Sequence, residues 1–190
     1  DTERMGWNGT NINAGWAARN HGMGLAEGEW ITFQDADDAS LLNRMRVQHE
    51  FAVKYGSSHV CVDWQKYAPD HLGKHLDVGR IRSVHGEGSL VTKTREILAL
   101  ARHSKGLIPS HFPWFHQRVP HRIRIRQIAR ELFFGDIYAH YPGAANCALV
   151  KAAVAREIGF RPLSQRVWPS RRGRGADRDF NFAVAENVRD

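Results

Sequence analysis

The chain has 190 residues, which is enough for one domain with a substantial core and leaves little room for a second. Hydrophobic residues make up 42% and charged residues 25%, a composition that excludes disorder throughout the chain. Lys and Arg outnumber Asp and Glu by 27 to 20, so the surface attracts anions such as nucleotide diphosphates, nucleic acids and acidic membranes.

No stretch of the sequence approaches the roughly 20 apolar residues that a membrane-spanning helix requires. Residues 1–4 lack the pattern of a signal peptide. We therefore expect a cytoplasmic protein, whose positive charge would also allow peripheral association with the inner face of a membrane.

The first third of the chain alternates between helical and extended patterns. Apolar residues at helical spacing predict a helix over residues 14–25, and the aromatic and β-branched run 29–34 predicts a buried strand. An amphipathic helix is predicted over residues 41–55 and a second strand over residues 59–64. The acidic residues 35–38 would therefore lie at the carboxyl end of a strand.

The rest of the chain has a less regular pattern. Residues 67–88 are rich in Pro, Gly and His and predict a loop or a short strand, whereas residues 90–101 have helical spacing. Further helices are predicted over residues 122–134, over residues 151–158 and near the end of the chain. We expect these elements to form one globular unit over residues 1–190.

The clearest motif lies between residues 13 and 38. Its members are Asn13, Gly15, Arg19, Asn20, Gly22, Gly28, Glu29, Asp35, Asp37 and Asp38. In this order and spacing they resemble the inverting family-two glycosyltransferases of GT-A fold. The resemblance implies an α/β fold with a mixed sheet flanked by helices. It also implies an enzyme that moves a sugar from a nucleotide-diphosphate donor to a hydroxyl group of a glycan, lipid-linked or polysaccharide acceptor.

The acidic turn gives this chemistry a physical basis. A diphosphate leaving group gains negative charge as the glycosidic bond breaks, and a hard cation such as Mn²⁺ or Mg²⁺ held by carboxylates neutralises that charge. In the resembled family the last aspartate of the aspartate-x-aspartate motif ligates the metal, which implies this role for Asp37. Asp38 is expected to share the role or to exchange it with Asp37.

The donor side of the predicted site is completed by Asp35 and Arg19. The first aspartate of the family motif lies near the nucleotide, which implies Asp35 as a donor-binding residue beside Asp37. Arg19 resembles the arginine that helps to hold the donor nucleotide. Two alternatives stay open: the aspartates also suit a solvated turn that caps the next helix, and Arg19 also suits an exposed position on a helix.

The general base is expected near the end of the chain. A segment of small residues over 146–160 ends in glycine-phenylalanine, and residues 175–180 contain two aspartates and an aromatic residue. The family has the same order, so the resemblance assigns the base to Asp177, which would take the proton of the acceptor hydroxyl. The preceding glutamate of the family is replaced by Ala176. Asp179 is the second candidate, and a surface aspartate paired with a nearby arginine is the alternative to a catalytic role.

The start of the chain differs from the resembled family. There, an apolar strand, a helix and a second strand that bind the nucleotide come before the arginine motif, and no such segment precedes Asp1. We therefore expect a catalytic domain that is truncated at its N-terminus.

Two functions from other classes compete with sugar transfer. The positive charge and the arginine-rich stretches would suit a basic nucleic-acid-binding module, but no recognised nucleic-acid motif is present, so a nucleic acid partner is not expected. The cluster of aspartates would also suit a metal-dependent phosphohydrolase, which needs no acceptor sugar.

Overall fold

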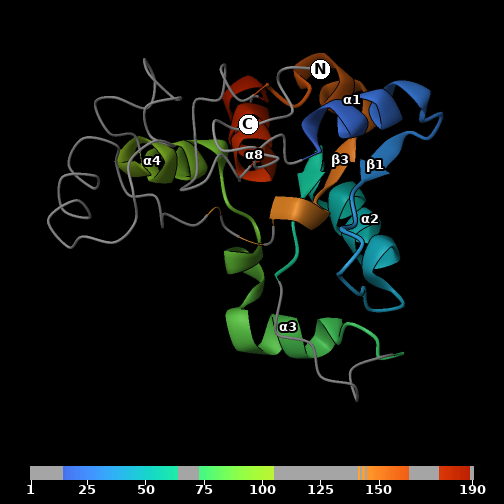
Figure 1. The fold of residues 1–190 in the computed structure, drawn as a ribbon. Coiled ribbons are helices and arrows are strands. Elements are labelled where there is room, and N and C mark those ends of the chain that lie inside the picture. Colours follow the sequence, from blue (N-terminus) through green and yellow to red (C-terminus); the bar gives the residue numbers. More distant parts are fainter. Residues whose placement is uncertain are drawn as a thin grey trace, which may run out of the picture.

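The structure is a computed structural model that describes residues 15–63, 73–104, 141, 143, 145–162 and 176–188. Figure 1 shows its elements in chain order. These are α1 (Trp16–Leu25), β1 (Trp30–Thr32), α2 (Arg44–Tyr55), β2 (His59–Val60), α3 (Val78–His85), η3 (Glu87–Leu90), α4 (Thr94–Ser104), η4 (Ala145–Cys147), β3 (Leu149–Lys151), α7 (Ala152–Ile158) and α8 (Ala176–Asn187). The helix expected over residues 122–134 lies outside the described residues.

Three short strands form the described sheet in the order β1-β3-β2. The central strand β3 pairs antiparallel with both neighbours, so that Ile31 and His59 both lie opposite Val150. The expected combination of a sheet with flanking helices is present. The expected mixture of parallel and antiparallel pairing is not seen among the described strands, because β1 and β2 run in the same direction but β3 separates them.

Most of the predicted elements in the described residues are found, often shorter than expected. The helices predicted over 41–55 and 151–158 are α2 and α7, and each ends at a glycine with positive φ, Gly56 and Gly159. The strand β3 was not expected, because its apolar residues continue without a break into the pattern of α7 and periodicity alone does not separate them.

The prediction of a loop or short strand over residues 67–88 is wrong for α3. Asp77 caps this helix by accepting a hydrogen bond from the backbone N–H of Arg80 at 2.9 Å. None of its residues is buried, and its eight residues lie in a stretch rich in Gly and His, a composition that favours a loop in a sequence. Figure 1 shows α3 at the opposite end of the molecule from α1 and α8.

The main core lies between the sheet and the helices α1, α7 and α8. Its buried members are Met23, Ile31, Ala148, Val150, Ala152, Ala155, Phe160, Ala176, Phe180 and Val184. Small alanines on α7 and α8 allow these helices to pack closely, and the aromatic rings of Phe160 and Phe180 fill the space beside them. Among the described helices, none has both the length and the apolar character that crossing a bilayer requires.

Two buried polar side chains of α2 fasten this helix to the sheet. Arg44 donates to the backbone carbonyl of Cys147 at 2.9 Å and to the hydroxyl of Thr32 at 3.1 Å. Gln48 donates to the same Cys147 carbonyl at 2.9 Å and to the carbonyl of Val60 at 2.8 Å. These bonds hold the backbone immediately before β3. The residue preceding Cys147 is Asn146, whose side chain reaches the acidic turn.

Candidate functional site

Strand β1 delivers the acidic turn to one edge of the sheet. The turn is closed by a backbone hydrogen bond from Asp38 N–H to the carbonyl of Asp35 at 3.1 Å. Gln34 braces it by donating to the carbonyl of Asp38 at 2.6 Å. Asp35 is half-buried, whereas Asp37 and Asp38 are exposed. The last two aspartates of the turn are therefore accessible to solvent, whereas the first is partly covered by the protein.

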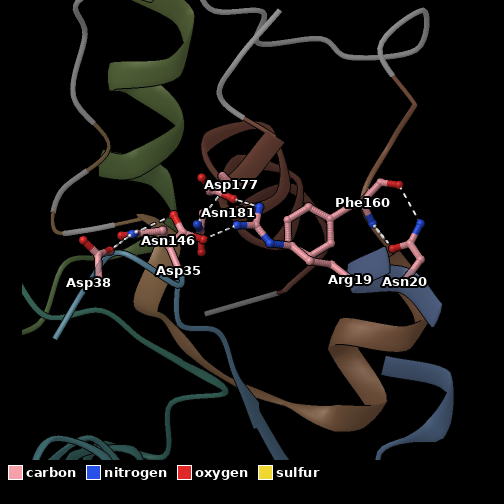
Figure 2. Close-up of polar contacts among 8 residues, drawn as sticks. All are labelled: Arg19, Asn20, Asp35, Asp38, Asn146, Phe160, Asp177 and Asn181. Atoms are coloured by element: carbon pink, nitrogen blue, oxygen red, sulfur yellow. Dashed lines mark hydrogen bonds and ion pairs between the residues drawn. The ribbon is translucent and has the colours of Figure 1, made fainter. Parts of the chain in front are cut away.

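Arg19 on α1 brings two distant parts of the chain together (Figure 2). One terminal nitrogen of its guanidinium pairs with the carboxylate of Asp35 at 2.7 Å, and the other pairs with the carboxylate of Asp177 at the start of α8. Only 17% of the Arg19 side chain is exposed, so the alternative of an exposed helix cation is wrong. Three of the residues expected at the site thus meet at one guanidinium.

The surroundings of Arg19 hold its side chain in this position. The guanidinium lies over the rings of Phe160 and Phe33, at 5.4 and 5.9 Å from their centroids. The neighbouring Asn20 accepts from the backbone N–H of Phe160 at 2.7 Å and donates to its carbonyl at 2.9 Å. This pair of bonds fastens α1 to the segment that follows α7.

Asn146 joins the acidic turn from the other side, and no role had been expected for it. Its side-chain amide donates to Asp38 at 2.6 Å and to Asp35 at 3.3 Å, as Figure 2 shows. Asp35 and Asp38 therefore point toward one amide, whereas Asp37 faces the solvent. The sequence offered only its position at the start of the small-residue segment, which does not reveal this contact.

The donor set suits a hard cation that is shared with a substrate. Among the described residues there is no group of three or more His, Cys, Asp or Glu side chains arranged to hold a metal ion. Mg²⁺ is usually held by only one or two carboxylates together with substrate phosphates, rather than by a complete protein cage. The exposed carboxylates of Asp37 and Asp38 fit this requirement, and they are the residues that would hold the ion.

The two candidate bases at the start of α8 have different surroundings. The carboxylate of Asp179 is fully buried and pairs with Arg161 at 3.1 Å. Arg161 also lies 3.7 Å from Glu186, so Asp179 belongs to an ion-pair group that anchors α8. The side chain of Asp177 is 25% exposed and lies beside Arg19. An acceptor hydroxyl could reach Asp177 but not Asp179.

Residue 176 is alanine where the resembled family has glutamate, and the structure shows why a small side chain fits there. Ala176 is 2% exposed and belongs to the main core, directly before Asp177. A glutamate at this position would have to bury a charge or turn away from the core. The small side chain therefore lets the first turn of α8 pack closely against its neighbours.

A chain of buried and half-buried polar side chains lies next to Asp177. His59 on β2 contacts the side-chain oxygen of Asn181 through Nε2 and the hydroxyl of Tyr141 through Nδ1, the latter at 3.2 Å. Asn181 donates to the backbone carbonyl of Asp177 at 2.7 Å. Burial lowers the pKa of His59 from 6.5 to about 4, and the bond to Asn181 opposes this only in part. The imidazole is therefore neutral near pH 7.

Because of His59, we expect the fold to lose stability in mild acid. The folded-state pKa of about 4 lies below the ordinary value of 6.5, so the unfolded chain takes up the proton first as the pH falls. The contribution of the neutral ring to the free energy of unfolding is fully present above about pH 6.5. It is lost progressively as the pH falls toward 4, by up to about 3 kcal/mol. Urea denaturation between about pH 7 and pH 4 measures this loss.

The variant His59→Gln is the control for this dependence, since an amide does not titrate. We expect its free energy of unfolding to fall less steeply over the same pH range. Equal slopes for the two proteins would show that other groups, not His59, cause the acid sensitivity.

Comparison with known families identifies the family to which the chain belongs. A family model described as glycosyl transferase family 2 matches residues 11–133, which is more than half of the chain. No curated protein and no solved structure matches the chain. The family implies a GT-A-like α/β fold, a nucleotide-sugar donor and an acceptor, and its members commonly use divalent metals. The chain belongs to glycosyl transferase family 2 and is a glycosyltransferase.

Proposed function

We propose that this glycosyltransferase moves a hexosyl group from a nucleotide-diphosphate donor to a hydroxyl group of a glycan, lipid-linked or polysaccharide acceptor, with inversion at the anomeric carbon. The observation that supports this most is the contact of Arg19 with Asp35 on one side and Asp177 on the other. The acidic turn and the candidate base come from opposite ends of the chain. For a sugar to be transferred, the acidic turn and the candidate base must lie no farther apart than about the length of one sugar.

The donor end of the site is formed by Arg19, Asp35 and Asp37. The guanidinium supplies positive charge and several N–H donors, which suit a diphosphate or the nucleotide to which it is attached. Asp37 and Asp38 would hold the cation on the exposed side of the turn. When bound there, Mn²⁺ or Mg²⁺ neutralises charge on the departing diphosphate.

Asp177 is the proposed general base. It takes the proton of the acceptor hydroxyl while the oxygen forms its bond to the anomeric carbon and the bond to the diphosphate oxygen breaks. The partial exposure of Asp177 supports this role, because an acceptor must reach the carboxylate. The full burial of Asp179 supports a structural role for that residue.

We further propose that residues 1–190 belong to one catalytic domain on the cytoplasmic side of a membrane. The excess of positive charge supports a peripheral contact with acidic lipid at the inner face. Membership of a glycosyltransferase family favours sugar transfer over the nucleic-acid-binding module and the phosphohydrolase.

Replacing Asp37 with alanine tests the donor and metal assignment. We expect Mn²⁺-dependent binding of a nucleoside diphosphate to weaken roughly tenfold or more, since losing an interaction with a charged group costs about 1.5–3 kcal/mol. Titration calorimetry with uridine, guanosine and thymidine diphosphates, each with and without Mn²⁺, measures this. The parent chain should bind at least one of the three more tightly with the metal.

The matched control is Glu157→Ala, which removes the same charge from an exposed position on α7. It should bind nucleotide as the parent does. If Asp37→Ala also binds like the parent, the metal assignment is wrong. If the chain binds none of the three diphosphates but binds an oligonucleotide in a salt-dependent way, the nucleic-acid-binding module is supported instead. Hydrolysis of simple phosphate esters would support the phosphohydrolase.

A further inference from the structure

The side chains of Tyr141, His59 and Asn181 form a continuous path from β2 to the first turn of α8. Asn181 is fully buried and Tyr141 is buried, so these polar groups bond to each other instead of to bulk water. The path ends at the backbone carbonyl of Asp177. Removing one member of this path would destabilise the fold, because its neighbour would become a buried polar group without a partner.

The contacts define the direction of each hydrogen bond. Asn181 uses its side-chain N–H group on the carbonyl of Asp177, so its oxygen is the atom that faces His59 Nε2. That oxygen only accepts, and therefore Nε2 carries the hydrogen. Nδ1 of the neutral ring then accepts from the hydroxyl of Tyr141. The Cys61 sulfur also lies 3.8 Å from Nε2.

Asp177 lies where a helix is least well held. The first turn of a helix has backbone N–H groups without partners inside the helix, and helix ends open more readily than helix centres. A carbonyl has two lone pairs, so that of Asp177 can accept from the side chain of Asn181 in addition to a helical N–H group. The bond therefore restrains the turn that carries the carboxylate.

Aromatic packing holds the other end of the path. The ring of Tyr141 lies edge-on to the ring of the fully buried Phe182, with centroids 5.2 Å apart, and edge-on to His59 at 5.8 Å. His59 itself is fixed in register opposite Val150 on the central strand. The path thus connects Asp177 to the sheet, whereas the contact with Arg19 connects it to α1.

We infer that Tyr141, His59 and Asn181 are positioning residues that hold Asp177 in place for proton transfer from the acceptor. This inference rests on the proposed role of Asp177 as the base. His59 does not touch the reacting atoms and acts only through Asn181. Loss of the His59 bond should therefore lower kcat and leave the binding of donor nucleotide unchanged.

The variants His59→Gln and His59→Leu separate positioning from packing. Glutamine has an amide N–H group that can replace Nε2–H toward Asn181, whereas leucine has a similar size and no donor. We expect kcat of the leucine variant to fall roughly tenfold or more, since small misplacement of a reacting group has large effects, while the glutamine variant stays within about threefold of the parent. The assay measures turnover of uridine, guanosine and thymidine diphosphate sugars and the KM of each.

Hydrogen exchange of the backbone amides of residues 177–182 provides a readout that does not need activity. Exchange should become faster in the leucine variant and remain close to the parent in the glutamine variant. The inference is overturned if leucine changes neither exchange nor kcat, if it raises KM instead of lowering kcat, or if glutamine is as damaging as leucine. If the parent turns over no sugar nucleotide, the proposed function fails, and the exchange rates alone then decide whether the path restrains this turn.

Discussion

The variant Asp177→Asn should lose most of the sugar transfer, with kcat reduced roughly 10²–10⁴-fold. Asparagine keeps the size of the side chain but has no lone pair basic enough to take a proton from a hydroxyl group. The donor is expected to bind as before, because Arg19, Asp35 and Asp37 stay in place. Turnover of the nucleotide sugars and calorimetry with the nucleoside diphosphates measure the two effects separately.

Stability should change little in this variant. The ion pair between Asp177 and Arg19 is partly exposed, so its loss costs about 1 kcal/mol or less. Glu157→Gln is the matched control, as it makes the same carboxylate-to-amide change on an exposed helix position. Asp177 is not the base if the asparagine variant keeps turnover within tenfold of the control.

Replacing Phe180 with alanine should destabilise the fold by about 3–5 kcal/mol. Its ring is 1% exposed and stacks on the ring of Phe160 with centroids 4.3 Å apart and planes 12° from parallel. It also meets Phe33 edge-on at 6.1 Å. Alanine would leave a cavity where helix α8 packs against the sheet, and urea denaturation measures the free energy of unfolding.

The cavity left by Phe180→Ala would also affect the candidate functional site. Phe160 and Phe33 are the rings that lie against the guanidinium of Arg19, so a cavity beside them loosens that side chain. Val53→Ala is the control, because Val53 is 67% exposed and its truncation should change stability by less than about 0.5 kcal/mol. A similarly small loss for Phe180→Ala would mean that the stacked rings are not central to the core.

The sequence predicted much of the site because its motifs are local. Arg19 belongs to one motif with the acidic turn, and Asp177 follows a small-residue segment at the distance found in the family. Their order and spacing, which resemble those of the family, were enough to nominate them. The helices α1, α2, α4 and α7 were predicted for a similar reason, since each has an apolar stripe or a glycine stop that is visible in a short window.

Other features carried no local signal. Helix α3 is short and lies in a stretch rich in Gly and His, which favours a loop, and β3 continues directly into a helix, which favours one continuous element. Asn146 reaches the acidic turn across more than a hundred residues of sequence, and its type is common in loops. Asn181 looks like an ordinary helix residue until its two partners are seen.

Motifs and hydrophobic periodicity are visible in a linear sequence. They were therefore enough to indicate the family, the order of most elements and the candidate residues Arg19, Asp35, Asp37, Asp38 and Asp177. Which of these residues meet follows from the folded structure. It placed Asp35 and Asp177 on one guanidinium, separated Asp177 from the buried Asp179, and added Asn146 and His59. The physical reason is that burial and long-range pairing depend on how α1 and α8 pack around the sheet, and no short stretch of sequence encodes that packing.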